Sequence, residues 1–174
     1  MNDAMLIAHL QANTHASLSL RPQAEADVAL LRALFVARRA AEFAAMPWSD
    51  AERTAFLHAQ ADLQSRHYAQ HYVHACMLII EQESQAIGRL CVSEGADELR
   101  VVDIALLPAW QGKGIGSGLL HAVLAWADQH GKACTLSVDQ ANPARALYRR
   151  LGFDAGADPG LYLQMRRPPM PARP

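Results

Sequence analysis

The first third of the chain repeats apolar residues with the period of a helix. One predicted helix ends before Pro47, and its apolar positions are Val28, Leu31, Leu34 and Phe35. Ser49 and Glu52 then have the spacing of a capping box, in which two side chains satisfy free amides at a helix start. They predict a second helix that continues toward Tyr68. Residues 1–16 show no clear period, so we expect an N-terminal segment that need not be ordered.

The rest of the chain contains short apolar or β-branched runs that polar turns separate. The runs that predict strands lie at 18–20, 76–81, 87–92, 99–107, 133–138 and 161–165. The three in the middle follow one another closely, which indicates an antiparallel meander. A long amphipathic helix and then a short one separate the later strands. The predicted order is therefore strand, two helices, three strands, helix, strand, helix and strand.

The turn that leads into the long amphipathic helix is rich in glycine. It reads LLPAWQGKGIGSGLL over residues 106–120. The helix behind it has a regular apolar stripe and ends at Gly131; the stripe is Ile115, Leu119, Ala122, Val123 and Trp126. A helix N-terminus presents unpaired N–H groups and a partial positive charge, and glycine lets a ligand approach the backbone. We therefore expect this turn to bind an anion such as phosphate.

The spacing of the glycines excludes two common phosphate-binding motifs. In a P-loop, Ser or Thr follows the Gly-Lys pair, whereas here Gly114 follows Lys113. A dinucleotide fingerprint needs glycine at its first, third and sixth positions, and no frame of this turn has one at the sixth. A flexible turn without a ligand is the remaining alternative, but Lys113 and Ser117 at the start of a strongly amphipathic helix favour a binding turn.

Two segments resemble the sequence motifs of one family. Residues 111–116 (QGKGIG) are similar to motif A of the GNAT superfamily of N-acetyltransferases, whose pattern is Gln/Arg-x-x-Gly-x-Gly/Ala. Residues 142–153 (NPARALYRRLGF) are similar to motif B of the same superfamily, N-x-x-A-x-x-L-Y-x-x-x-G-F. The two motifs follow each other in the family's order. The resemblance is sharp over 101–153 and diffuse before it.

This resemblance implies an α/β protein with the GNAT fold. In that fold a mixed, mostly antiparallel sheet is splayed between its fourth and fifth strands and flanked by helices. The domain is expected to be single and to cover 17–167, between the segment 1–16 and a Pro-rich tail at 168–174 that we expect to be disordered. Dimers are frequent in the family, so the resemblance is also compatible with a homodimer.

The resemblance further implies acetyl-CoA as co-substrate, bound in the slot where the sheet is splayed. Its pantetheine arm is expected to pair with the exposed strand edge near Leu106, as an added strand would. Its pyrophosphate is expected on the amides of the glycine turn. The expected cofactor-binding residues are Leu106, Leu107, Gln111, Gly112, Lys113, Gly114, Ile115, Gly116, Ser117, Asn142 and Tyr148.

The implied reaction is acetyl transfer to a primary amine by direct attack on the thioester in a ternary complex. By hypothesis, Tyr148 protonates the leaving thiolate, the Leu106 N–H stabilises the oxyanion, and Asp103 deprotonates the amine. Asp103 interrupts an apolar strand, and an ion pair with Arg100 or Arg149 is the alternative interpretation of this carboxylate.

The second motif also predicts the limits of its own short helix. Asn142 is a suitable N-cap, Pro143 a suitable first residue, and Gly152 a suitable stop. Tyr148 is expected on a face beside the buried stripe of Ala144, Leu147 and Leu151. An ordinary boundary tyrosine would have the same position, so only the family motif favours a catalytic role.

The second early helix is expected to form a wall of the acceptor site, because the early helices of GNAT proteins usually determine acceptor choice. The residues expected there are Phe56, Gln60, Gln64, His67 and Tyr68. His67 and His71 lie four positions apart, a spacing that also suits metal ligands. No carboxylate or cysteine nearby completes a ligand set, so we predict no metal.

Composition narrows the class of protein. The 174 residues are 51% hydrophobic with a net charge of −1, which suits one domain with a core and gives no indication of a nucleic-acid partner. Cys76, Cys91 and Cys134 lie in apolar runs, which predicts buried, reduced thiols. No run approaches the ~20 apolar residues of a membrane span, and the start is a poor signal peptide, so we predict a cytoplasmic protein without a membrane partner.

Two functions are compatible with these patterns. One is an enzyme that acetylates a small-molecule amine or a protein amine. The other is a catalytically silent GNAT-fold module that binds acyl-CoA as a sensor or partner-binding unit. The intact motif residues Gln111, Gly114, Gly116 and Tyr148 favour the enzyme. The identity of the acceptor is left open.

Overall fold

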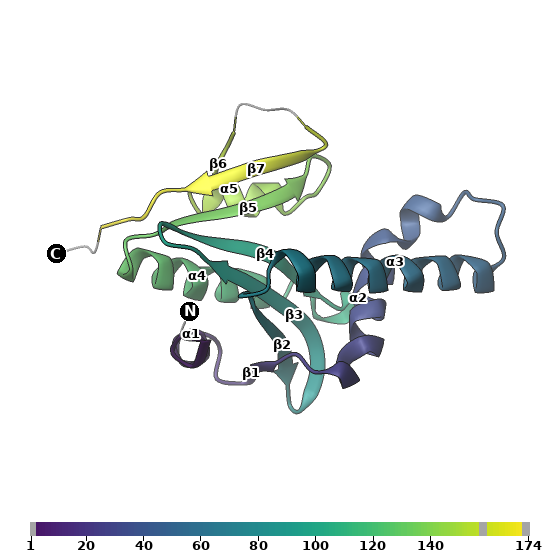
Figure 1. The fold of residues 1–174 in the computed structure, drawn as a ribbon, viewed down its shortest axis with the longest axis horizontal. Helices are drawn as coiled ribbons and strands as arrows, with labels where there is room; N and C mark the ends of the chain where they lie inside the picture. The colour runs from purple at the N-terminus through teal and green to yellow at the C-terminus, as the bar shows by residue number, and fades with distance from the viewer. Residues whose placement is uncertain (1–2, 157–159, 172–174) are drawn as a thin grey trace.

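The computed structural model describes residues 3–156 and 160–171. Within them, seven strands form one sheet in the order β1-β2-β3-β4-β5-β7-β6 (Figure 1). The strands are β1 Leu18–Pro22, β2 Cys76–Gln82, β3 Gln85–Glu94, β4 Glu98–Leu106, β5 Ala133–Asp139, β6 Asp154–Ala155 and β7 Tyr162–Arg167. The α-helices are α1 Asp3–Ala12, α2 Val28–Arg39, α3 Asp50–His71, α4 Ile115–Gln129 and α5 Arg145–Arg150. Short 3₁₀ turns occupy Glu25–Asp27, Ala40–Phe43 and Pro108–Trp110.

The sheet is splayed between β4 and β5. These two strands are parallel, whereas all other neighbouring strands of the described sheet are antiparallel. Their pairing begins at Glu98 and ends at Val101, which lies opposite Leu136. β4 then continues to Leu106 while the two strands run apart (Figure 1). The predicted splay is confirmed, and no described strand pairs with this edge of β4 beyond Val101.

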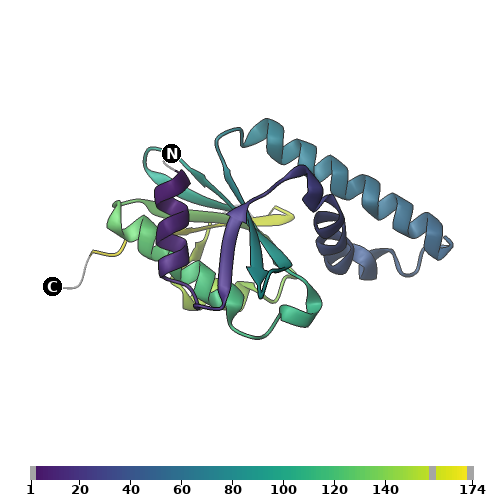
Figure 2. The ribbon, with the colours of Figure 1, turned by 90° about the horizontal axis from the view of Figure 1, so that it is seen from below.

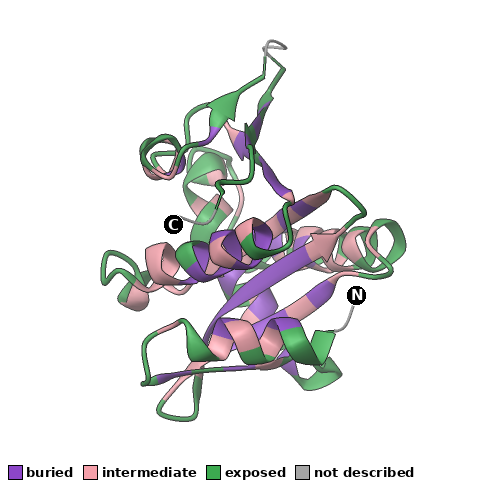
Figure 3. Cartoon of the chain, turned by 90° about the vertical axis from the view of Figure 1, so that its left-hand side faces the viewer, coloured by how far each residue is buried: buried purple, intermediate pink, exposed green. Residues whose placement is uncertain are grey.

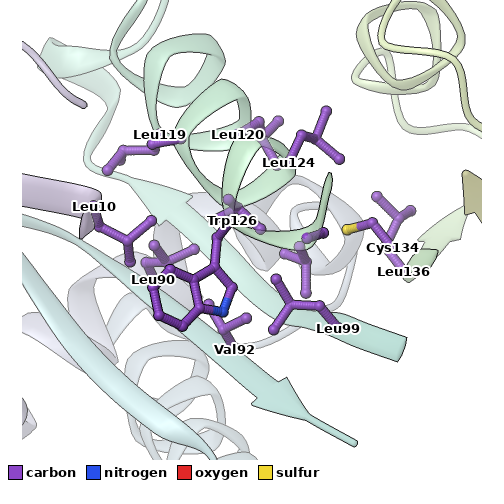
Figure 4. Close-up of a cluster of buried hydrophobic side chains, with 14 of the residues drawn as sticks. Leu10, Leu90, Val92, Leu99, Leu119, Leu120, Leu124, Trp126, Cys134 and Leu136 are labelled. Carbon is purple, nitrogen blue, oxygen red and sulfur yellow. The ribbon is translucent and has the colours of Figure 1, made fainter. Parts of the chain in front are cut away.

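Helices cover both faces of the sheet. Figure 2 shows α1 and α4 on one face and α2 and α3 on the other. The main core lies beneath α4, where Leu119 and Trp126 pack among side chains of β3, β4 and β5, with Leu10 of α1 beside them (Figure 4). Fully burying one such leucine stabilises the fold by roughly 1.5–3 kcal/mol. Burial therefore concentrates along the strands and α4, and the loops are exposed (Figure 3).

The N-terminal segment contains a helix that the sequence pattern does not predict. Leu6 and Leu10 of α1 are completely buried, and His9 Nε2 is hydrogen-bonded to the Ala122 carbonyl of α4 at 3.0 Å. The Gln11 side chain bonds the backbone of β1. The apolar residues of this helix are distributed around its whole circumference, so its sequence has no helical period that would indicate a buried face. The helix is held in place by its tertiary contacts with α4 and β1, which a local sequence pattern does not reveal.

The other predicted elements form close to their expected bounds. The Ser49 hydroxyl accepts from the Glu52 amide and the Glu52 carboxylate accepts from the Ser49 amide, which confirms the capping box of α3. The two exposed residues of β6 are too few to give a sequence signal. Of the Pro-rich tail, Met170 donates its amide to Asp128 at 2.8 Å, and 172–174 lie outside the described residues. None of the described helices is long and apolar enough to cross a membrane.

A β-bulge on β4 decides which side chains face which layer. The register with β3 shifts between Val101 and Asp103, which leaves Val102 as an extra residue. Without this bulge, Val101 and Asp103 would share a face, because side chains alternate along a regular strand. With it, Val101 and Ile104 both join the core beneath α4. Asp103 faces the opposite layer, where it meets Arg38 of α2.

Candidate functional site

The start of α4 is an uncapped helix N-terminus. Gly112 and the N-cap residue Gly114 have φ angles of +73° and +79°, a left-handed conformation that favours glycine. No side chain caps the helix, and Gly118 N–H donates to Gly114 C=O. The amides of Ile115, Gly116 and Ser117 precede this bond and so lack helical acceptors. Together with the helix dipole, they form a donor site for an anion.

Two side chains of the turn are held beside these amides. Lys113 Nζ lies 4.8 Å from the centroid of the Trp110 ring, within cation–π distance. Gln111 Nε2 donates to the Leu106 carbonyl at 2.9 Å. The lysine thereby adds positive charge to the anion site, and the glutamine joins the turn to the end of β4. The structure thus brings the first motif and the splayed strand together.

The two residues at the end of β4 differ in how their backbone groups are used. Leu107 N–H donates to Ile87 C=O on β3 at 2.9 Å, and Leu107 C=O accepts from Trp110 N–H. Successive residues of a strand direct these groups to opposite sides, so Leu106 N–H points away from β3. The Leu106 N–H therefore lies on the edge of β4 that no longer pairs with β5. Of the two predicted residues, Leu106 presents a free amide there, whereas the backbone of Leu107 is engaged elsewhere.

Tyr148 of α5 is more buried than its sequence pattern predicts. It is 8% exposed, and its ring meets Phe153 edge-on at 6.0 Å between centroids. The predicted buried stripe is itself half-buried; its members are Ala144, Leu147 and Leu151. The expectation that Tyr148 lies outside the core was wrong, because a short helix beside the splay buries a second face. Burial raises the pKa of Tyr148, against the opposing effect of the Arg38 guanidinium, so the phenol stays protonated at neutral pH.

The start of α5 also differs from the prediction. The helix begins at Arg145, after a turn that Asn142 closes. Asn142 Oδ1 accepts from Ala144 N–H at 2.9 Å, and Asn142 C=O accepts from Arg145 N–H at 3.1 Å. Asn142 therefore stabilises the approach to the helix rather than capping a helix at Pro143. Its contact with the cofactor stays a prediction.

Asp103 lies between two arginines from different layers of the fold. Its side chain is 5% exposed. Oδ2 accepts from Arg89 Nε at 2.9 Å and from Arg89 Nη2, and Oδ1 accepts from Arg38 Nη2 at 3.0 Å. The ion pair predicted as an alternative exists, but not with Arg100 or Arg149. Arg100 donates instead to side chains of β5 and β7, Ser137 and Gln164.

These arginines keep Asp103 ionised. Burial alone would raise the pKa of Asp103, but the Arg38 and Arg89 guanidiniums outweigh it and lower the pKa below its usual value. Both carboxylate oxygens already accept charge-assisted hydrogen bonds. Such a group is a poor acceptor for the proton of an ammonium, whose pKa is about 10. The geometry favours the ion-pair interpretation of Asp103 over the role of a base.

The residues predicted on α3 have different surroundings. Gln64 Oε1 accepts from Arg89 Nη2 at 3.1 Å, which joins it to the Asp103 cluster. Gln60 is half-buried on the same helix. His67 is exposed and stacks on His71 with 4.0 Å between ring centroids. Contact of Gln60 and His67 with an acceptor stays a prediction.

Two members of this cluster, Arg89 and Arg38, are absent from the sequence prediction, whereas Tyr68 is among the residues expected on the acceptor wall. Arg89 interrupts the apolar run of β3 as Asp103 interrupts that of β4, and opposite charges on neighbouring strands were a usable signal. Tyr68 lies beneath Arg89, 5.3 Å from guanidinium carbon to ring centroid. Arg38 is one of two consecutive arginines at a helix end, and only tertiary packing distinguishes it from Arg39.

The three cysteines are free and buried, as predicted. Burial raises the pKa of Cys76 to about 11 and the pKa values of Cys91 and Cys134 to about 12. A thiol with such a pKa remains protonated at neutral pH and is a weak nucleophile. None of the three is a candidate for carrying an acyl group.

Comparison with known proteins identifies the family. The model of the acetyltransferase (GNAT) family matches residues 37–153, which is more than half of the chain and includes the start of α4 and all of α5. The chain belongs to the GNAT family. The α4 turn and the splayed strands of this GNAT protein lie within the matched residues. The cluster around Asp103 lies within the same matched region.

Solved structures show the same fold in other GNAT proteins. The PaiA N-acetyltransferase of Thermoplasma acidophilum, solved with coenzyme A, has a TM-score of 0.64 and 19% identity, covering 87% of this chain and 99% of that chain. The ribosomal-protein-S18-alanine N-acetyltransferase of Escherichia coli has a TM-score of 0.59 and 20% identity, covering 90% and 97%. At these identities the likeness establishes the fold alone.

One curated relative is more similar in sequence over a shorter stretch. The [ribosomal protein bS18]-alanine N-acetyltransferase of Haemophilus influenzae is 34% identical to this GNAT protein over 74 residues. These residues are 42% of this chain and 51% of that protein. The chain thus matches about half the length of this relative.

Proposed function

We propose that this GNAT protein is an N-acetyltransferase that transfers the acetyl group of acetyl-CoA to a primary amine. The observation that supports this most strongly is the position of the unpaired edge of β4 directly before the uncapped start of α4. The strand edge offers strand-type hydrogen bonds, and the helix start offers amides for an anion. Tyr148, a protonated phenol on α5, completes the site.

The residues present fit the two chemically different parts of coenzyme A. Its pyrophosphate suits the free amides of Ile115, Gly116 and Ser117 and the ammonium of Lys113. Its pantetheine amides suit the free edge of β4, where Leu106 presents its N–H. When bound, the cofactor supplies an acetyl group activated as a thioester.

In a direct transfer, an uncharged amine nitrogen attacks the thioester carbon, the carbon–sulfur bond breaks, and the amine nitrogen loses a proton to solvent. The Leu106 N–H is directed toward the slot and can donate to the carbonyl oxygen as negative charge develops there. The Tyr148 hydroxyl donates a proton to the departing sulfur, and solvent restores that proton. No covalent bond to the protein is needed.

For Asp103 we propose a positioning role in place of the role of a base. Its carboxylate, on β4, binds Arg89 of β3 and Arg38 of the last turn of α2. These contacts fix the layer of α2 and α3 against the sheet beside the splay. The amine then has to arrive as its free base, or lose its proton to water, before it attacks.

The acceptor we propose is a primary amine of a small molecule or a protein. The names of the Haemophilus influenzae and Escherichia coli relatives give an alanine of a ribosomal protein as their acceptor. For this chain we infer only that the acceptor is an amine. A cytoplasmic location agrees with three free, buried cysteines.

A thiol-release assay tests this proposal. Purified protein is incubated with acetyl-CoA and pooled primary amines, and free coenzyme A is measured together with N-acetyl product. An enzyme releases thiol only when an amine is present. A catalytically silent module instead shows a ligand-induced rise in melting temperature without thiol release, and a chain with neither signal contradicts the proposed site itself.

A further inference from the structure

Arg38 is a charged side chain of the site that the proposed transfer does not use. It lies in the last turn of α2 and donates to Asp103 Oδ1. Its side chain is 41% exposed, whereas that of Arg89, the other arginine of the cluster, is 6% exposed. The two arginines that share one carboxylate therefore have different environments: Arg89 is an internal residue and Arg38 faces outward.

The charge of this cluster is unbalanced. One carboxylate, Asp103, is shared by two guanidiniums, so the three groups together carry one positive charge. Arg89 directs its donors to Asp103 and Gln64 and covers the Tyr68 ring. Within the described residues, the one hydrogen bond of Arg38 goes to Asp103, although a guanidinium has five N–H donors. The surplus charge is thus on the exposed arginine.

This surplus charge lies near the proposed proton donor. Arg38 lowers the pKa of Tyr148, and Tyr148 in turn raises the pKa of Arg38, so the two side chains are close enough to interact electrostatically. Arg38 is on α2, which packs against β3, and Tyr148 is on α5, which follows β5, so the two side chains come from the two halves of the sheet that the splay separates. Arg38 is also bonded to Asp103, three residues before Leu106 on β4, so an acceptor amine that attacks the thioester between Leu106 and Tyr148 lies within electrostatic reach of Arg38.

We propose that Arg38 binds an anionic group on the acceptor, so that the substrates are primary amines that carry a carboxylate. This inference rests on the proposed acetyl transfer and adds its substrate class. Arginine matches a carboxylate with two parallel N–H donors, and the unused donors of Arg38 allow such a contact while the Asp103 bond is kept. The same charge repels an acceptor that has a second ammonium group, which gives selection in both directions.

Matched acceptors test this substrate class with the wild-type protein. The small-molecule arm compares γ-aminobutyrate with γ-aminobutyramide and with a diamine of the same length, with rates expressed per free-base amine. The peptide arm compares alanyl-aspartyl and alanyl-asparaginyl peptides with amidated C-termini. We expect kcat/KM to be roughly tenfold to a hundredfold higher for the carboxylate in the arm that contains the true acceptor, and lowest for the diamine.

Substitution of Arg38 assigns the preference to this side chain. In Arg38→Gln, we expect KM for the carboxylate acceptor to rise by about tenfold or more, with a much smaller change for the amide acceptor. Arg38→Glu should reverse the order so that the diamine becomes the better substrate. Arg39→Gln is the matched control, because Arg39 is the neighbouring arginine and pairs with Glu42. It should keep the wild-type preference.

Two outcomes separate this inference from the proposed function. If the wild-type protein releases no thiol with any amine, acetyl transfer itself is contradicted. If it acetylates carboxylate, amide and diamine acceptors equally, or if Arg38→Gln lowers kcat equally for all three, transfer stands and the anion-binding role of Arg38 is overturned. Melting temperatures of the variants, measured in parallel, identify a loss that comes from unfolding alone.

Discussion

Arg89 and Asp103 form a buried ion pair across two neighbouring strands although they are not opposite each other. The register pairs Arg89 with Ala105 and Asp103 with Cys91, so the ion pair is diagonal. The bulge at Val102 turns Asp103 toward the layer of α2 and α3. The pair thus connects the sheet to both helices, because Asp103 accepts from Arg38 of α2 and Arg89 donates to Gln64 of α3.

Removing this carboxylate should destabilise the protein. In Asp103→Asn, two arginines lose their shared counter-charge, and the buried Arg89 is left uncompensated. Loss of one partner of a buried pair costs about 3–5 kcal/mol, so we expect the free energy of unfolding from urea denaturation to fall by about that amount. Asp154→Asn, at an exposed position of β6, is the control and should leave the midpoint unchanged. Equal midpoints for all three proteins would contradict this role of Asp103.

The same pair should make stability depend on pH in a defined window. The pKa of Asp103 is lower in the folded protein than in the unfolded chain. Its contribution is therefore complete above the unfolded pKa of about 4 and is lost as the pH falls through the lower, folded value. We expect the difference in unfolding free energy between wild type and Asp103→Asn to be constant from pH 6 to pH 8 and to shrink below about pH 4.

Tyr148→Phe tests the proposed proton donor. The ring is retained, so packing against Phe153 should persist, while the departing sulfur loses its proton source. We expect kcat to fall by roughly 10²–10⁴-fold with KM for acetyl-CoA changed little. A loss well under tenfold in kcat would exclude Tyr148 from this role. The pKa of the phenol is raised, so the wild-type rate should not decline between pH 7 and pH 9 through its ionisation.

Gly114→Ala tests the anion site at the start of α4. Gly114 has a φ of +79°, so an alanine there strains the turn and displaces the amides that follow, even though its Cβ would meet open space. We expect KM for acetyl-CoA to rise by about tenfold, with a smaller change in KM for the amine. Gly118→Ala is the matched control, because Gly118 lies inside the helix, also with open space at Cβ. Equal effects of the two substitutions would argue against the turn as the binding site.

The start of α4 shows what the sequence can predict and why. Glycine spacing, an apolar stripe and a terminal glycine are all local, so the turn, the helix and its free amides follow from residues close together in the chain. The capping box of α3 is predictable for the same reason. The splay between β4 and β5 came from family resemblance, because strand pairing joins residues far apart in sequence.

The environment of Asp103 was not predictable from local patterns. Arg38 lies 65 residues away in the sequence. Arg89 lies on the neighbouring strand, but the bulge at Val102 reverses the side-chain alternation on which a prediction of its pairing with Asp103 depends. In the sequence, nothing distinguishes Arg38 from the neighbouring Arg39 as the partner of Asp103. The helix α1 is a similar case, since Leu6 and Leu10 are buried by packing against α4 and β1 and the helix has no polar face.

Thiol modification tests whether a cysteine carries the acetyl group during transfer. With pKa values of about 11 to 12 and buried positions, Cys76, Cys91 and Cys134 should react with a disulfide reagent only after unfolding. We expect native protein to retain its transferase activity after treatment with iodoacetamide at neutral pH. Rapid inactivation that acetyl-CoA prevents would indicate a reactive cysteine in the site instead.

Direct transfer at the splayed strands is tested most directly by following an isotope-labelled acetyl group from acetyl-CoA by mass spectrometry. We predict that the label appears on the amine nitrogen, that free coenzyme A forms in equal amount, and that the mass of the protein does not change during turnover. Label that becomes attached to the protein, or acetyl-CoA that stays intact with every amine supplied, would contradict this account.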